Sequence, residues 1–300
     1  MGSQTDFIKR ELSKTGFQLE DKVASIFYKL KDFEIEPSYD FTDWQTGGTR
    51  ELDMRITYHV TPQPIRIEYI LLIECKSLPG HAWTFIRSHG DHILFKDATS
   101  IWDNVGKSGR QEPLIKILEP LIKVNQPVAG TFSTRYKEII IDKEKSNKRD
   151  DNILSSAVKL AKVMYFEQKR EKRIDAILMR SSKKNFDHIR IYYPLIVFEG
   201  DMYEATLLPD VHLKSISSAH LRNFSIQNRK EIDMVIDVVK VEKLKDFIQT
   251  AFLKEAEQVR KNEAELRKPY LSLIEKMKFK KKIVRSLEML ADFVPLGLPR

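Results

Sequence analysis

The sequence Ile67-Glu-Tyr-Ile-Leu-Leu-Ile-Glu-Cys-Lys76 carries the strongest structural signal of this 300-residue chain. Its apolar residues continue almost without a break until Glu74 and Lys76, which is typical of a strand that is buried on both faces until its polar end. The preceding stretch, residues 51–60, alternates between apolar and polar side chains and predicts a second strand. We expect one face of that second strand to carry Leu52, Met54, Ile56 and Tyr58.

A tight turn is predicted between these two strands. The intervening residues, Thr61-Pro62-Gln63-Pro64, contain two prolines, which cannot both sit in the middle of a sheet. A hairpin centred between Gln63 and Pro64 places Asp53 opposite Glu74. Side chains that face each other in this way have Cβ atoms about 4.5–5.5 Å apart, close enough for one cation to bridge two carboxylates. Lys76 shares a strand face with Glu74 because the two are two residues apart.

Two carboxylates and a lysine in this arrangement are the side chains that metal-assisted hydrolysis of a phosphodiester requires. The carboxylates can hold a divalent cation, and the lysine can steer or activate a water. The same side chains would also form a surface salt-bridge cluster, which stabilises a protein little. Charges at the end of a buried strand are costly unless they pair or hold a metal. The hairpin by itself leaves both interpretations open.

The arrangement of Asp53 and Glu74-Cys75-Lys76 resembles the PD-(D/E)XK nuclease superfamily, in its restriction-endonuclease-like and Mrr-type branch. The resemblance covers residues 16–78. In this family a helix that carries a glutamate precedes the first strand. Here the matching helix is predicted at 17–31 from its apolar stripe of Leu19, Val23, Ile26, Phe27 and Leu30. Glu20 is then the matching acid.

The resemblance implies an α/β fold with a restriction-endonuclease-like mixed central sheet flanked by helices. The expected core elements are helix 17–31, strands 33–41, 51–60 and 67–76, helix 152–169 and strand 188–199. We expect Pro79-Gly80 to end the third strand and Gly200-Asp201 to form a hairpin turn. A nuclease-like domain at 1–240 would contain an insertion at 79–150 and extra strands at 201–240. A helical C-terminal extension would follow at 241–300.

The resemblance also implies a Mg²⁺-dependent (or Mn²⁺-dependent) deoxyribonuclease that leaves 5′-phosphate ends, with a role in defence. The implied catalytic residues are Glu20, Asp53, Glu74 and Lys76. Asp53 and Glu74 would bind the metal, and Glu20 would be a further ligand, directly or through water. One alternative is a protein of the same fold that binds nucleic acid or a protein partner without cutting. Another is a structural protein in which these acids form only ion pairs.

Charge and composition agree with a nucleic-acid partner, which the resemblance implies to be DNA. The net charge is +8, which favours a polyanion through counterion release. Near the C-terminus, basic side chains cluster at Lys276, Lys278, Lys280, Lys281 and Lys282. This cluster would either clamp a nucleic-acid backbone or form a solubilising face. The polar helix surface at 255–261 would serve a homodimer or face solvent.

The expected location is the cytoplasm, without a membrane. The single cysteine, Cys75, suits a reducing compartment and is expected to face the apolar side of its strand. No apolar run approaches the roughly 20 residues of a membrane span.

A second group of potential metal ligands follows Lys76 directly. His81, His89, Asp91 and His92 fall within a short polar stretch, and imidazoles with a carboxylate can bind zinc or a catalytic metal. Trp83, Phe85 and Ile86 lie among them and indicate ordinary packing. Contact with the substrate, a metal role and packing therefore all remain open for these histidines.

Overall fold

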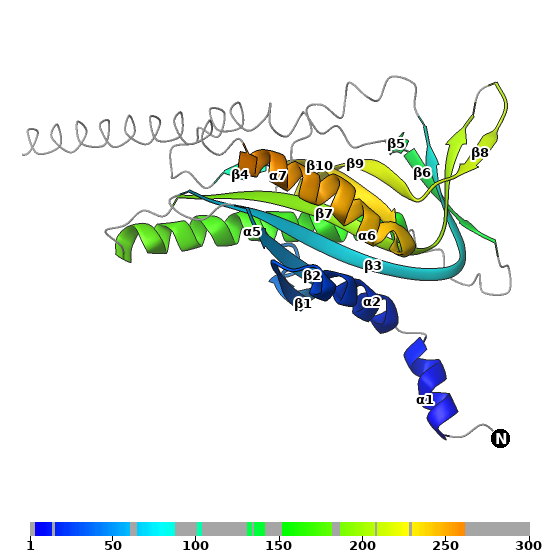
Figure 1. The fold of residues 1–300 in the computed structure, drawn as a ribbon, viewed down its shortest axis with the longest axis horizontal. Helices are drawn as coiled ribbons and strands as arrows, with labels where there is room; N and C mark the ends of the chain where they lie inside the picture. Colours follow the sequence, from blue (N-terminus) through cyan, green and yellow to red (C-terminus); the bar gives the residue numbers. More distant parts are fainter. Residues whose placement is uncertain are drawn as a thin grey trace, which may run out of the picture.

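The computed structural model describes residues 4–13, 16–60, 65–87, 101–103, 131–133, 135–141, 152–181, 187–207, 209–227 and 230–261. Within these residues the chain has an α/β fold. A ten-stranded mixed sheet carries helices on both of its faces (Figure 1). None of the helices in this part of the chain is long and apolar enough to cross a membrane.

The helical elements are α1 (Gln4–Ser13), α2 (Phe17–Lys29), α5 (Asn152–Ser181), the short helix η2 (Val241–Lys243), α6 (Leu244–Phe247), the π-helical turn η3 (Ile248–Phe252) and α7 (Leu253–Lys261). The strands are β1 (Phe33–Thr42), β2 (Thr49–His59), β3 (Ile65–Ile86), β4 (Ile101–Asp103), β5 (Thr131–Ser133), β6 (Arg135–Ile140), β7 (Asp187–Thr206), β8 (His212–Ser215), β9 (Ser218–Gln227) and β10 (Lys230–Lys240). The main sheet order is β1-β2-β3-β7-β10-β9-β5, with β6 beside β3 and with β4 and β8 beside β7.

The predicted hairpin and its register are confirmed. β2 and β3 are antiparallel, with Met54 opposite Ile73 and His59 opposite Glu68. Asp53 and Glu74 are the next residues in this register, just beyond the pair Met54–Ile73. The predicted helix at 17–31 is α2, the one at 152–169 is the first part of α5, and the strand predicted at 188–199 lies within β7, parallel to β3.

The two predicted strand breaks are wrong. β3 passes through Pro79-Gly80 to Ile86, and β7 passes through Gly200-Asp201 to Thr206. The strands stay paired along this length, with a register shift between Ser77 and Ala82. A bulge of this kind takes up extra residues on one strand, and proline is tolerated there because the bulged residues leave the ladder. Gly80 supports the bulge with a φ of +82°, which glycine adopts without strain.

Gly200 allows β7 to pass close to this bulge. A Cβ atom at position 200 would lie 2.5 Å from Cζ of Phe198 and 3.3 Å from the carbonyl oxygen of Leu78. Phe198 cannot easily yield, because it is buried and its ring is stacked on Trp83 with the centroids 4.0 Å apart. Replacing Gly200 would therefore overpack the sheet.

We expect Gly200→Ala to lower the free energy of unfolding by about 1–3 kcal/mol, the usual cost of overpacking a core. Urea unfolding followed by circular dichroism measures this loss. Gly48→Ala is the control, since a Cβ atom there would meet only the Thr46 hydroxyl, at 3.6 Å. Equal stability of the two variants would contradict the expected clash.

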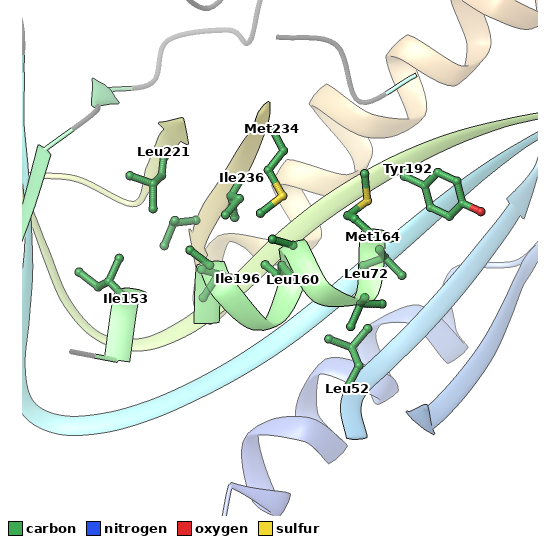
Figure 2. Close-up of a cluster of buried hydrophobic side chains, with 14 of the residues drawn as sticks. Leu52, Leu72, Ile153, Leu160, Met164, Tyr192, Ile196, Leu221, Met234 and Ile236 are labelled. Carbon is green, nitrogen blue, oxygen red and sulfur yellow. The ribbon is translucent and has the colours of Figure 1, made fainter. Parts of the chain in front are cut away.

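Two hydrophobic clusters lie on opposite faces of the sheet. The first packs α2, α6 and α7 on β2, β3 and β7. The second packs α5 on the other face. In Figure 2, Leu160 and Met164 of α5 lie among side chains of the sheet, including Leu72, Ile196 and Ile236. The central strands are thus covered on both sides, as their apolar sequence requires.

Leu52 corrects one predicted face. It was expected beside Met54 and Ile56, but it lies in the second cluster whereas those two lie in the first. The paired stretch of β2 and β3 ends at Met54, so β2 is free to twist beyond that residue. On the neighbouring strand, Ser38 has a φ of +50° between Pro37, opposite Met54, and Tyr39, opposite Leu52. β1 and β2 therefore both change the direction of their side chains at the position of Ser38 and Asp53.

Glu255 of α7 makes the stability of this packing depend on pH. Its carboxylate oxygen Oε1 accepts a hydrogen bond of 3.0 Å from the Tyr69 hydroxyl. Burial raises the pKa of Glu255 to about 7. The Tyr69 hydrogen bond opposes this rise and the charge of Asp237 reinforces it. Between the ordinary carboxyl pKa and 7, the folded protein holds a proton that the unfolded chain has released, so stability falls as the pH rises through this window.

We expect Glu255→Gln to be more stable than the natural protein at pH 8, by about 1–3 kcal/mol, and equal to it near pH 4.5. The reason is that glutamine keeps a hydrogen-bond acceptor for Tyr69 and has no charge to bury. Urea unfolding at both pH values measures the difference. The exposed Glu257 provides the control variant Glu257→Gln. A gain of the same size at both pH values would refute the assigned titration.

Candidate active site

The candidate site lies where β2 and β3 separate. Beyond Met54 the Asp53 carboxylate enters the gap, where its Oδ2 accepts a hydrogen bond of 2.6 Å from the backbone N–H of Cys75. The Asp53 side chain thus accepts the hydrogen bond of Cys75 N–H in place of a backbone carbonyl. The Asp53 side chain keeps 13% of its surface exposed, whereas Glu74 keeps 1%. The site is therefore a nearly closed, acidic end of the strand pair.

Glu74 has a lysine ammonium beside each carboxylate oxygen. Nζ of Lys76 lies 2.8 Å from Oε1, and Nζ of Lys159 lies 2.5 Å from Oε2. The same Lys159 ammonium lies 3.1 Å from Oδ1 of Asp53. Burial raises the pKa of Glu74 and the charge of Asp53 raises it further, while the two lysines lower it. One cation from α5 therefore joins the two predicted metal ligands.

Glu20 lies on α2, close enough to be affected by these charges. Burial raises the pKa of Glu20 to about 7, and the negative charges of Asp53, Glu51 and Glu74 add to the effect, while Lys159 opposes it. In the described part of the chain, however, no three His, Cys, Asp or Glu side chains are grouped closely enough to hold a metal ion. The structure thus brings Asp53, Glu74 and Lys76 together and leaves Glu20 as a nearby charge.

The sequence analysis did not identify Lys159. A usable signal was the run Ala157-Val158-Lys159-Leu160-Ala161-Lys162-Val163-Met164, in which two lysines interrupt an apolar stretch. Residues three apart lie on the same side of a helix, so both lysines were candidates to reach acids on the sheet. Lys162 does so too, with Nζ 2.8 Å from Oδ2 of Asp43.

The N-terminus of α5 is fixed by β6. Oε2 of Glu138 accepts a hydrogen bond of 3.0 Å from the backbone N–H of Asn152, and Oε1 accepts one of 2.9 Å from its side-chain amide. His81 Nδ1 lies 2.7 Å from Oε1 of the same glutamate. His81 therefore helps to hold this helix end. The other predicted ligands of its group, His89, Asp91 and His92, fall outside the described residues.

Further along α5, Glu167 ties the helix to the edge of the sheet. Its carboxylate is fully buried and accepts a hydrogen bond from the Tyr39 hydroxyl and one of 3.3 Å from the Tyr192 hydroxyl. Arg170 lies 3.3 Å away and Arg55 lies 3.6 Å away from Oε1. This network holds the helix against β1, β2 and β7.

The prediction that Cys75 faces the apolar side of its strand is confirmed. Its side chain is buried in the first hydrophobic cluster, on the apolar side of β3, and burial raises the pKa of its thiol well above the ordinary value. The basic cluster at Lys276, Lys278, Lys280, Lys281 and Lys282 lies outside the described residues, so its predicted contact with nucleic acid stays a prediction.

Comparisons of the chain with protein-family models, curated proteins and solved structures found no match.

Proposed function

We propose that this protein is a metal-dependent nuclease of the PD-(D/E)XK type, acting on DNA. The observation that carries the proposal is the convergence of the Asp53 and Glu74 carboxylates on one cation position, with Lys76 beside them. Burying the two carboxylates on neighbouring strands costs free energy. A salt bridge could form at the surface without this cost, so the burial favours a functional role for the two acids.

The order of the core elements supports the same proposal. One helix (α2) precedes three antiparallel strands (β1, β2 and β3), and α5 then leads to β7, which is parallel to β3. This is the order implied by the resemblance to restriction-endonuclease-like proteins. In the proposed nuclease, β2 and β3 carry Asp53 and Glu74, and α5 and α2 cover the site from opposite faces of the sheet.

The donor set suits a hard divalent cation. Asp53 and Glu74 would hold Mg²⁺ or Mn²⁺ through carboxylate oxygens, and Glu20 would contribute directly or through water. The metal would polarise a phosphate oxygen and lower the pKa of a bound water. Lys76, held beside Glu74, would orient that water and offset negative charge at the phosphate. Burial of Glu74 keeps its carboxylate in a fixed place for this role.

One observation favours a second candidate, a nuclease-fold protein that binds nucleic acid or a protein partner without cutting. Lys159 already neutralises both acids where a metal would be held. If that contact is permanent, the site cannot take up a metal. The net charge of +8 would still favour a polyanionic partner.

Cleavage assays separate the two candidates. Supercoiled plasmid and linear single-stranded and double-stranded DNA would be incubated with the full chain in Mg²⁺, Mn²⁺ or EDTA. We expect cutting with either metal and none in EDTA. Retarded migration of the same DNA without any cutting would support the binding protein and refute the nuclease.

A further inference from the structure

We propose that Lys159 is an internal counter-cation, which holds Asp53 and Glu74 in the metal-free protein and has to leave before a divalent metal can bind. This inference rests on the proposed function and adds a residue that the resemblance does not supply. It gives α5 a residue that competes with the metal for both carboxylates.

The geometry makes the ammonium and the metal mutually exclusive. Nζ of Lys159 lies 2.5 Å from Glu74 Oε2 and 3.1 Å from Asp53 Oδ1, and so it stands between the two acids. Carboxylate oxygens hold Mg²⁺ at about 2.0–2.1 Å, so a metal bound to these two acids would need the same oxygen atoms. The ammonium and the metal would therefore compete for one place.

The charges lead to the same conclusion. Asp53 and Glu74 carry two negative charges, and Lys76 and Lys159 carry two positive charges, so the four side chains are balanced as they stand. A divalent cation added beside both lysines would meet like charge at short range in a partly buried site, where screening is weak. Once Lys159 has left, two carboxylates face the metal, and of the two lysines Lys76 alone remains beside them.

Lys159 can leave without unfolding α5. The start of α5 is held by Glu138 through two hydrogen bonds to Asn152, so the backbone keeps its place. The Lys159 side chain keeps 23% of its surface exposed, and its flexible four-carbon stem can rotate toward solvent.

The test compares Mn²⁺ binding to the full natural chain and to Lys159→Met by isothermal titration calorimetry, with no DNA present. Methionine keeps an apolar stem of similar length and has no charge. We expect Lys159→Met to bind Mn²⁺ tighter by about tenfold or more. Thermal unfolding gives a second readout, in which Mn²⁺ should raise the melting temperature of Lys159→Met more than that of the natural protein.

Lys162→Met is the matched control. Lys162 lies on the same helix and also pairs with an aspartate, Asp43, at 2.8 Å, but it contacts neither predicted metal ligand. Its variant should bind Mn²⁺ like the natural protein. Adding Asp53→Asn to Lys159→Met should abolish the gain in affinity, because the tighter binding requires the freed carboxylate.

The outcomes distinguish this inference from the proposed function. If the natural protein binds Mn²⁺ and Lys159→Met binds it no tighter, the counter-cation is refuted and the nuclease proposal stands. If neither protein binds Mn²⁺, both proposals fail, since removing the competitor has opened no site. Lys159→Gln, which is neutral and polar, replaces Lys159→Met should the latter not fold, and the same outcomes apply to it.

Discussion

Asp53→Asn is expected to lower the rate of the proposed metal-dependent DNA cleavage by at least about a hundredfold, because one of the proposed charged metal ligands would be lost and a bound metal supplies several kcal/mol of transition-state stabilisation. Asparagine is preferred to alanine because its amide oxygen can still accept the hydrogen bond from Cys75 N–H, which Asp53 accepts at 2.6 Å. The structure where β2 and β3 separate should therefore be unchanged in this variant. The rate of plasmid nicking at saturating Mn²⁺ measures the effect.

Two further variants complete this experiment. Lys76→Ala should show a comparable loss of cleavage, since the proposal gives Lys76 the task of orienting the water beside the metal ligands. Asp40→Asn, at an exposed position opposite Glu51 on β1, should cleave at the natural rate. Undiminished cleavage by correctly folded Asp53→Asn would mean that the reaction occurs elsewhere in the chain.

Glu167→Ala is expected to cost about 3–5 kcal/mol of folding stability, the range seen when one partner of a buried ion pair is removed. The Arg55 side chain is only 9% exposed and would lose the Glu167 carboxylate, 3.6 Å away. The hydroxyls of Tyr39 and Tyr192 would lose their acceptor as well. Urea unfolding followed by circular dichroism measures the change.

The matched variants are Glu167→Gln and Glu242→Ala. Glutamine keeps an oxygen that can accept from the tyrosines, so its loss should be clearly smaller than that of alanine. Glu242 is exposed, and its variant should be close to the natural protein in stability. A loss below about 1 kcal/mol for Glu167→Ala would show that the buried network contributes little.

The local hairpin was predictable because its information is local. Alternation in residues 51–60, the apolar run 67–76 and the prolines between them define the register, which pairs Met54 with Ile73 and leaves Asp53 and Glu74 one residue beyond that pair. Pro79-Gly80 misled the prediction for the opposite reason. Those residues do break regular pairing, but β7 continues alongside, so the strand resumes after a bulge. Nothing near residue 80 in the sequence reports on β7.

The position of Lys159 shows a second limit of the sequence. The apolar stripe of residues 152–169 predicts the helix and its buried face, but not which side chains the lysines beside that face will meet. Those partners come from distant segments of the chain, as with Asp43 for Lys162 and Glu74 for Lys159. Glu20 is a second example. Its place on α2 was predictable, but its distance from Asp53 and Glu74 depends on how α2 packs on the sheet.

The parallel pairing of β3 with β7 has a consequence for how the protein folds. Neighbouring residues in this pair, such as Glu74 and Ile196, are separated by more than a hundred positions in the chain. Contacts between such distant segments raise the contact order, and proteins rich in them fold slowly because a long loop has to close first. Until β7 is synthesised, the most apolar strand of the chain lacks its central neighbour. The newly made N-terminal half is therefore the part that depends most on protection from aggregation.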